Sequence, residues 1–241
     1  MGADAAVAAV FEPVRTATTF EETVDRLGTA IRLGILAPGS RLPSERDLAE
    51  QLAISRSTLR QAITALVESG HLTSVRGRTG GTFVVPEPPL AEGSAGPLPE
   101  GWHEVLDVRI AVEVGVATVA AERIDADALA VMAEAVERMD AATEFEEYRR
   151  ADVRFHIAIA QATGVPRLVA LATEVQAEVT ELIAHIAHPP QVLRHSNADH
   201  RRLIDTLARR DAARATRVVR RHLDGTEHIL SGLMPGGPLP E

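Results

Sequence analysis

Cysteine is missing from all 241 residues of the chain, which excludes disulfides and thiolate metal ligands. No apolar run reaches the roughly eighteen residues that a membrane-spanning helix needs. The alanine-rich start, residues 1–10, lacks the basic flank of a secretory signal peptide. We therefore expect a cytoplasmic protein that does not span a membrane.

Lysine is also absent, so all 25 basic residues are arginine, and 34 acidic residues bring the formal net charge to -9. This charge excludes a protein that coats nucleic acid indiscriminately, because non-specific affinity comes mainly from neutralised phosphates. It leaves room for one local basic surface, since the planar guanidinium group of arginine binds guanine edges, phosphates or carboxylates bidentately.

The clearest break in the chain is the segment Pro86–Pro99 (PEPPLAEGSAGPLP), which is rich in proline and glycine and has no apolar periodicity. Short helical patterns and then two strand-like runs precede this break, whereas helical periodicity continues after it to about Ser231. We predict a first domain at residues 12–85, a linker at residues 86–99 and a helical domain at residues 100–232.

Three short helices are predicted before the break. Thr19 and Glu22 form a capping-box pattern at the start of the first helix, and Ser44 and Ser55 are the predicted N-caps of the second and third. The third helix is expected to stop at Gly70. Two helices this short, separated by a tight turn, are typical of a helix-turn-helix.

A β-hairpin is predicted directly after the third helix. His71–Val75 and Thr82–Val85 are β-prone runs on either side of a glycine-rich turn at residues 76–81. Such a hairpin would form a wing, so the first domain is predicted to be a winged helix-turn-helix of three helices plus a β-hairpin.

The arginines of this domain are placed for DNA recognition, because a recognition helix presents base-reading and phosphate-binding side chains near its N-terminus. Between Arg41 and Arg78, six arginines stand against four acidic residues. Any one of these arginines could simply be a solvent-exposed charge on a helix face or at the tip of the hairpin. That interpretation does not explain why they occur together at these positions. The candidate contacts are Arg56, Ser57, Thr58 and Arg60 on the third helix, Arg46 on the second, and Arg76 and Arg78 on the hairpin.

The segment Leu42–Val85 (LPSERDLAEQLAISRSTLRQAITALVESGHLTSVRGRTGGTFVV) closely resembles the N-terminal domain of the GntR superfamily of bacterial regulators. The resemblance implies a homodimer that reads a short palindrome in double-stranded operator DNA. The residues that it implies at the DNA are Arg46, Arg56, Ser57, Thr58, Arg60, Arg76 and Gly77.

Six helical periods follow the linker, with connections so short that neighbouring helices are expected to pack antiparallel as a bundle. The complete fold prediction is therefore mainly α, with a winged helix-turn-helix followed by an all-α antiparallel bundle. The expected helices are Trp102–Ala121, Asp125–Ala142, Phe145–Thr163, Pro166–Ala187, Gln191–Arg210 and Asp211–Ser231.

Three of these helices carry a histidine inside an apolar stripe. Asp152 and His156 lie one turn apart on one helix, and His200 and His222 occupy comparable positions on two later helices. One carboxylate and three imidazoles suit zinc, nickel, manganese or iron. Each histidine taken alone would more simply be a core residue hydrogen-bonded to a carbonyl group, and sequence distance does not prove that the four side chains converge.

From about Leu106 to Leu230 the chain resembles the FCD-type C-terminal domain of the FadR subfamily, in the stretches VLDVRIAVEVGVATVAAER, DVRFHIAIAQATG, DHRRLIDTLARRD and RRHL. The metal-binding branch of that family uses an aspartate and a histidine four residues apart and two later histidines. One departure is Val165, where asparagine is common at the start of the next helix, which puts the capping there in doubt. The resemblance implies a divalent transition metal, zinc first, bound by Asp152, His156, His200 and His222.

Arg109 and Glu113 lie four residues apart on the first helix of the bundle, along its apolar stripe. One interpretation is an intrahelical ion pair worth a few tenths of a kcal/mol. The resemblance suggests instead an effector-binding role, in which the bidentate fork of Arg109 binds the carboxylate of a small organic acid, with Glu113 beside it.

Together these features predict a DNA-binding transcriptional regulator rather than an enzyme. The resemblance favours a repressor whose operator affinity is controlled by a small carboxylate effector bound at the metal site. Three alternatives stay open: the ion itself is the signal, the metal is purely structural, or the helical domain is a metal-dependent hydrolase fused to a DNA-binding module.

Overall fold

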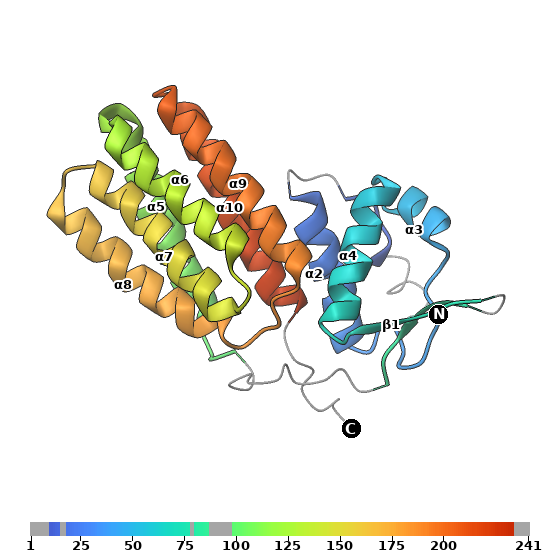
Figure 1. The fold of residues 1–241 in the computed structure, drawn as a ribbon. Coiled ribbons are helices and arrows are strands. Elements are labelled where there is room, and N and C mark those ends of the chain that lie inside the picture. Colours follow the sequence, from blue (N-terminus) through green and yellow to red (C-terminus); the bar gives the residue numbers. More distant parts are fainter. Residues whose placement is uncertain (1–9, 15–17, 78–79, 87–97, 234–241) are drawn as a thin grey trace. The chain divides into compact units, whose positions relative to one another are not determined.

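The structure is a computed structural model that describes residues 10–14, 18–77, 80–86 and 98–233 (Figure 1). Most of the predicted linker, at residues 87–97, and the hairpin residue Arg78 lie outside the described residues. The described part is mainly helical and contains one two-stranded sheet, which confirms the predicted fold class. A search of the same residues finds no helix with the length and apolarity needed to cross a membrane.

The chain forms two compact units, each built from separate segments. The first takes in the chain up to Leu98, the segment Ala184–Val192 and the chain from Gly225 onward. The second consists of Pro99–Ile183 and Leu193–Asp224. The last helix contributes residues to both units, because the boundary falls inside it.

Three helices form most of the first unit: α2 (Thr19–Arg32), α3 (Glu45–Gln51) and α4 (Arg56–Glu68). Their apolar residues recur at the spacing of one helical face, and this face supplies the core of the unit. The leucines that are completely shielded from solvent are Leu27, Leu48, Leu52, Leu59 and Leu66.

The N-caps of these helices match the sequence prediction in two cases and differ in one. The hydroxyls of Ser44 and Ser55 each accept a hydrogen bond from the amide three residues later, at 3.3 Å and 3.0 Å. Each bond satisfies an amide that the first turn leaves without an intrahelical partner. The predicted capping box is wrong, because Thr19 is already helical and the N-cap is Thr18, which makes no side-chain capping bond. Thr18 and Thr19 are both suitable N-cap residues, so the sequence pattern could not show which of them caps the helix.

The predicted hairpin consists of β1 (Leu72–Val75) and β2 (Gly81–Val84), which pair antiparallel with Leu72 opposite Val84. It follows α4 directly after Gly70, whose φ of 78° lies in the left-handed region that glycine tolerates. The wing that the sequence predicts is therefore present as a strand pair.

A further segment, residues 39–42, bonds to β2 in addition to the hairpin. The amide of Leu42 donates to the carbonyl of Thr82 at 2.9 Å, and the amide of Val84 donates to the carbonyl of Ser40 at 2.9 Å. The sequence analysis missed this pairing because the segment holds a glycine, a serine and an arginine instead of a β-prone run.

The end of α10 (Ala212–Gly232) packs against α2 within the first unit. A Cβ atom at Gly28 would lie 1.8 Å from the carbonyl oxygen of Gly232, and one at Gly232 would lie 2.5 Å from Cα of Asp25. The two backbones thus approach more closely than any side chain allows. Nearby, Nδ1 of His228 lies 3.0 Å from a carboxylate oxygen of Asp25, and this bond raises the pKa of His228.

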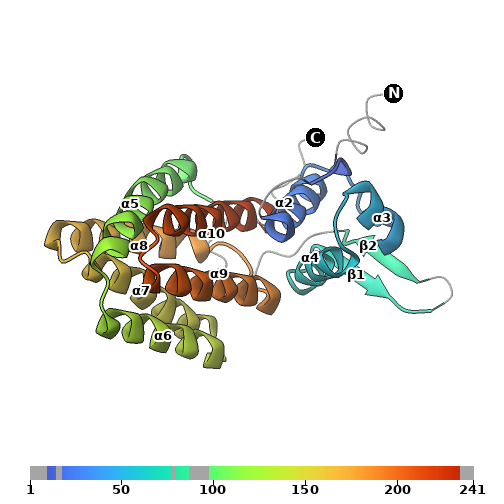
Figure 2. The same cartoon turned by 90° about the horizontal axis from the view of Figure 1, so that it is seen from above.

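The second unit is a bundle whose helices share one apolar core (Figure 2). Side chains such as Phe155, Met132 and Leu203 are almost completely shielded from water in it. The helices are α5 (Trp102–Arg123), α6 (Ala126–Ala141), α7 (Phe145–Ala162), α8 (Pro166–Ile183), and the larger parts of α9 (Pro190–Ala208) and α10.

The turn before α8 has Val165 at the position where asparagine was expected. Thr163 is buried, and its hydroxyl accepts a hydrogen bond from the amide of Val165 at 3.1 Å. Pro166 then opens the helix at a position where a missing amide hydrogen costs nothing. The bond from Val165 fixes the turn before α8, and among the described residues no side-chain cap is seen on the first turn of this helix.

The crossing of α2 and α10 predicts a sharp difference between two glycines. Gly28→Ala should lower the free energy of unfolding by about 1–3 kcal/mol, because its methyl group meets backbone atoms that cannot move independently. Gly225→Ala is the matched control, since its Cβ would meet only the flexible side chain of Glu21, at 3.3 Å. Urea unfolding of both variants measures the difference, and equal stabilities would contradict the close crossing.

Candidate functional site

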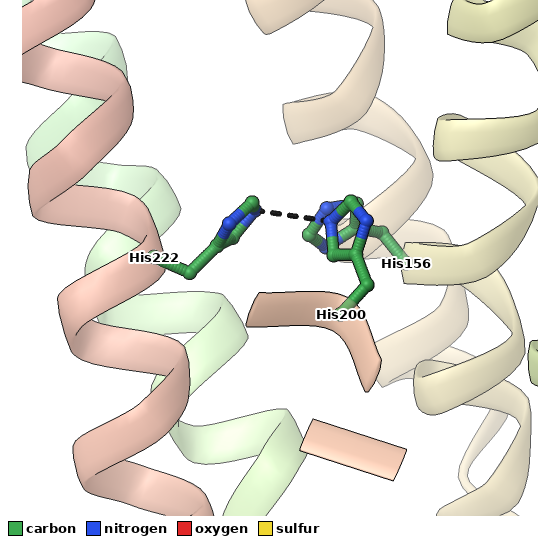
Figure 3. Close-up of side chains that lie close together, drawn as sticks. All are labelled: His156, His200 and His222. Carbon is green, nitrogen blue, oxygen red and sulfur yellow. Dashed lines mark hydrogen bonds between the residues drawn. The ribbon is translucent and has the colours of Figure 1, made fainter. Parts of the chain in front are cut away.

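Three histidines from three helices meet inside the second unit (Figure 3). His156 lies on α7, His200 on α9 and His222 on α10, and one ring nitrogen of each lies within 4.8 Å of the other two. The Nε2 atoms of His200 and His222 are 3.3 Å apart. The structure thus brings together three residues whose convergence the sequence could not establish.

Asp152, one turn before His156 on α7, adds a carboxylate oxygen to this group. Its Oδ1 lies 3.4 Å from Nε2 of His200 and 3.9 Å from Nε2 of His156. Ligand atoms that bind one zinc ion at about 2.0–2.2 Å stand roughly 3–3.5 Å from one another. The separations of 3.3 Å and 3.4 Å at Nε2 of His200 match such a ligand set, whereas the separation of 3.9 Å at His156 is wider.

Burial determines the ionisation of these groups, since none of the four residues is more than 7% exposed. Burial lowers the pKa of His200 to about 4 and lowers the pKa of His222 well below its ordinary value. Burial is the largest single influence on Asp152 and opposes its ionisation, but Arg149 and the three histidines together hold the carboxyl pKa below its ordinary range. Near neutral pH these three ligands are therefore already in the forms that bind a metal ion.

The donor set fits a divalent transition metal by a second observation. Nε2 of His156 is buried and has no hydrogen-bond partner, although it faces the other ligand atoms. A buried polar atom without a partner costs about 1–3 kcal/mol, and coordination to an ion would satisfy it. Three imidazole nitrogens and one carboxylate oxygen are ligands that zinc, nickel, manganese and iron accept.

Arg109 and Glu113 form the predicted ion pair on α5, but they form it in the interior. Nε of Arg109 lies 2.8 Å from Oε1 of Glu113, and their side chains are 3% and 6% exposed. The other oxygen of Glu113 lies 2.7 Å from Nδ1 of His156, with an alignment that falls short of a hydrogen bond. Burial is the largest single influence on Glu113 and opposes its ionisation, yet Arg109 and His156 together lower its pKa below the ordinary range. The pair is thus adjacent to the histidine cluster.

Two further buried residues, Arg149 and Gln176, complete this interior and were not singled out from the sequence. Arg149 donates through Nη1 to Oδ2 of Asp152, and Gln176 donates to Glu113 at 2.7 Å. Both interrupt apolar helix faces, which is the same signal that marked the histidines. It could have identified them, but neither residue type suggests metal binding by itself.

The predicted DNA-facing residues lie on the surface of the first unit. Thr58 is half-buried, with its hydroxyl 2.7 Å from that of Ser55. Residues of α3, the N-terminal turn of α4 and the wing therefore offer donors to solvent. Those that are exposed are Arg46, Arg56, Ser57, Arg60, Arg76 and Gly77.

Three arginines of this region already bind protein groups. Arg60 donates through Nε and Nη2 to one oxygen of Glu45, and Arg46 pairs with Asp47 at 3.2 Å. Exposed pairs of this kind contribute at most about 1 kcal/mol, so a phosphate or base edge can displace them. Arg41 differs, because its Nη2 donates to the carbonyl of Gly80 at 2.6 Å and ties the residue before β2 to the segment before α3.

Comparisons with known proteins match both units. The family "Bacterial regulatory proteins, gntR family" matches residues 19–84, and the "FCD domain" family matches residues 104–225. A relative in Mycobacterium gastri, named as the HTH-type transcriptional regulator RmpR, is 32% identical over 83% of this chain and 76% of its own length. A relative in Escherichia coli, named for the regulation of the L-lactate dehydrogenase operon, is 32% identical over 84% of this chain and 83% of its own.

Among solved structures, Escherichia coli McbR/YncC matches with a TM-score of 0.52 and 22% identity, over 90% of this chain and 98% of that one. This likeness concerns the fold alone. The relatives are named as transcription regulators and not as enzymes, which confirms that expectation and leaves the hydrolase alternative without support. The two family matches and the identity to these relatives show that the chain belongs to the GntR family of bacterial transcription regulators and carries an FCD domain.

Proposed function

We propose that this transcription regulator is a cytoplasmic, homodimeric repressor whose affinity for a palindromic operator depends on a small carboxylate bound at a metal site. The observation that carries the proposal is the convergence of Asp152, His156, His200 and His222 in an interior shielded from water. A divalent transition ion, zinc first, would supply a Lewis-acidic position for a carboxylate oxygen.

Arg109 supports a carboxylate as the class of effector. Its Nε is taken by Glu113, while its buried Nη1 has no partner. A guanidinium binds carboxylate oxygens through two parallel N–H bonds, so the open edge of the fork suits an acid. One relative is named for an L-lactate dehydrogenase operon, and L-lactate is an acid of this kind.

Control of operator affinity requires that the effector bind two states of the protein unequally. A repressor that releases DNA must bind the acid more tightly in its low-affinity state. Typical coupling free energies of about 1–3 kcal/mol change operator affinity roughly 5–150-fold. We expect the response of this protein to fall in that range.

The DNA-binding half of the proposal is supported by the start of α4. Arg56 and Ser57 are exposed at the N-terminal turn, where free backbone amides favour a phosphate. Arg60 lies one turn later on the same helix, and the wing adds Arg76. This arrangement suits a recognition helix in the major groove with a wing against the adjacent backbone.

A second copy of the chain is the proposed partner of the outer face of α5 and α8, which pack against each other. Among the described residues, four large hydrophobic side chains are exposed, and two of them, Val108 on α5 and Leu171 on α8, lie here. Ala111 and Gly115 extend the apolar row along α5. An exposed apolar patch of this kind is typical of a subunit interface.

Arg56→Ala should weaken binding to the operator by about 5- to 150-fold, because one bidentate base contact is worth about 1–3 kcal/mol. Fluorescence anisotropy with promoter fragments next to the gene measures this effect. Arg138→Ala is the control, since that exposed arginine lies on α6 and pairs with Glu134. Equal affinity of the two variants would argue against α4 as the recognition helix.

Val108→Glu and Leu171→Glu should each shift the protein from dimer to monomer, because a carboxylate in an apolar interface is left without a partner. Light scattering after gel filtration reads the molar mass directly. Leu33→Glu serves as the control, as Leu33 follows the end of α2 and is 59% exposed. A dimer that survives both substitutions would place the interface elsewhere.

Protein purified without chelator should carry one divalent ion per chain in native mass spectrometry. His156→Ala should lose that ion, whereas His103→Ala, at an exposed position on α5, should retain it. Metal-free wild-type protein from metal-replete cells, with the same spectrum as the His156→Ala variant, would contradict the metal site. The DNA-binding assignment would stand in either case.

The same protein separates the possible roles of the ion. Operator binding that falls on addition of small carboxylates, L-lactate first, only in the metal-loaded protein would support the proposal. Operator binding that follows the metal and ignores every acid would make the ion the signal. Unfolding of the helical domain on chelation, without a response to acids, would make the metal structural.

A further inference from the structure

A continuous chain of buried polar contacts lies beside the histidine cluster and joins three helices. It starts at Arg109 and Glu113 on α5, passes through Gln176 on α8 and ends at Arg149 and Asp152 on α7. Each of these five residues is at most 6% exposed. These contacts are therefore shielded from bulk solvent.

Gln176 is the central member of this chain, because its two amide atoms serve opposite partners. Its Nε2 donates to Oε1 of Glu113 at 2.7 Å, and its Oε1 accepts from Nη2 of Arg149 at 2.9 Å. A carboxylate needs a donor and a guanidinium needs an acceptor, so only one orientation of the amide satisfies both. Neither an acidic nor an apolar side chain could make both contacts.

The two partners of Gln176 each lie against a different metal ligand, Glu113 in a close ion-pair contact and Arg149 through a hydrogen bond. Oε2 of Glu113 lies 2.7 Å from Nδ1 of His156, on the side of the ring opposite to the unpartnered Nε2. Arg149 binds Oδ2 of Asp152, so Oδ1 is the oxygen that faces His156 and His200. His156 and Asp152 are thus each in contact with a residue, Glu113 or Arg149, that binds the side-chain amide of Gln176.

We propose that Gln176 is a positioning residue of the metal site, which sets the orientation of His156 through Glu113 and of Asp152 through Arg149. The inference rests on the proposed metal site and goes beyond its ligands. Groups that hold metal ligands in place typically change metal affinity by about 10- to 100-fold when they are removed. Arg149 keeps its contacts to the carbonyl of residue 176 and to Thr180 when the amide is lost, so the fold is expected to survive.

Cobalt(II) titration of the full chain tests this role, because cobalt reports both affinity and ligand geometry through its visible absorption. Gln176→Met keeps the side-chain volume but removes both hydrogen bonds. We expect its cobalt dissociation constant to rise about 10- to 100-fold and its absorption bands to shift at saturation. Gln161→Met, the same change at an exposed position of α7, should match the wild-type protein in both readouts.

A purely structural role is separated by measuring urea unfolding of the metal-free variants. Gln176→Met with wild-type cobalt affinity and spectrum would overturn the inference, whether or not its stability falls. Gln176→Asn provides a second test, since its amide is one methylene too short to reach both partners and should also weaken cobalt binding. Wild-type binding by Gln176→Asn would likewise overturn the inference. A wild-type protein that fails to bind cobalt would overturn the metal site itself, and the inference with it.

Discussion

A charge removed from water must find a partner, and the interior of the second unit is organised by this requirement. Arg109, Glu113, Arg149 and Asp152 are buried as two ion pairs, so their formal charges cancel before any ligand arrives. Breaking one buried pair typically costs about 3–5 kcal/mol. Helices α5, α7 and α8 are therefore joined by polar contacts as well as by apolar packing. The neutral imidazoles of His200 and His222 add no charge to this balance.

Arginine serves two opposite purposes in the two units, which a chain without lysine has to accomplish with one side chain. In the first unit, Arg46 and Arg60 form exposed pairs whose weakness allows an exchange of partners. In the second unit, the contacts of Arg149 leave no room for exchange, since it binds α8 and Asp152 together. The same guanidinium is adaptable at the surface and fixed in the interior, because solvent access decides the strength of each pair.

The sequence predicted the elements better than the contacts between them. Apolar periodicity and serine caps located the helices, and the later helices carry inward histidines at the predicted positions. Periodicity reports which face of a helix is buried, but not what lies opposite, so the spacing could not show that Glu113 approaches His156. Gln176 was missed for the same reason, because its role depends on partners 27 and 63 residues away in the chain. Residues 39–42 make strand-like hydrogen bonds because β2 lies beside them. Their own composition does not predict a strand.

The crossing of α2 and α10 also limits how the sequence can drift over evolutionary time. The space beside Gly28 is filled by the main chain of Gly232, so no exchange of side chain at position 232 could make room for a larger residue at 28. Packed interiors usually change by paired substitutions, in which one side chain grows and its neighbour shrinks. No such pair is available at this crossing, because the contact is made by the main chain. A Cβ atom at Gly225 on the same helix would meet only the flexible side chain of Glu21, at 3.3 Å, so alanine can be accommodated there when that side chain shifts. Within one helix, Gly232 is thus fixed by backbone contact, whereas Gly225 meets only a flexible side chain.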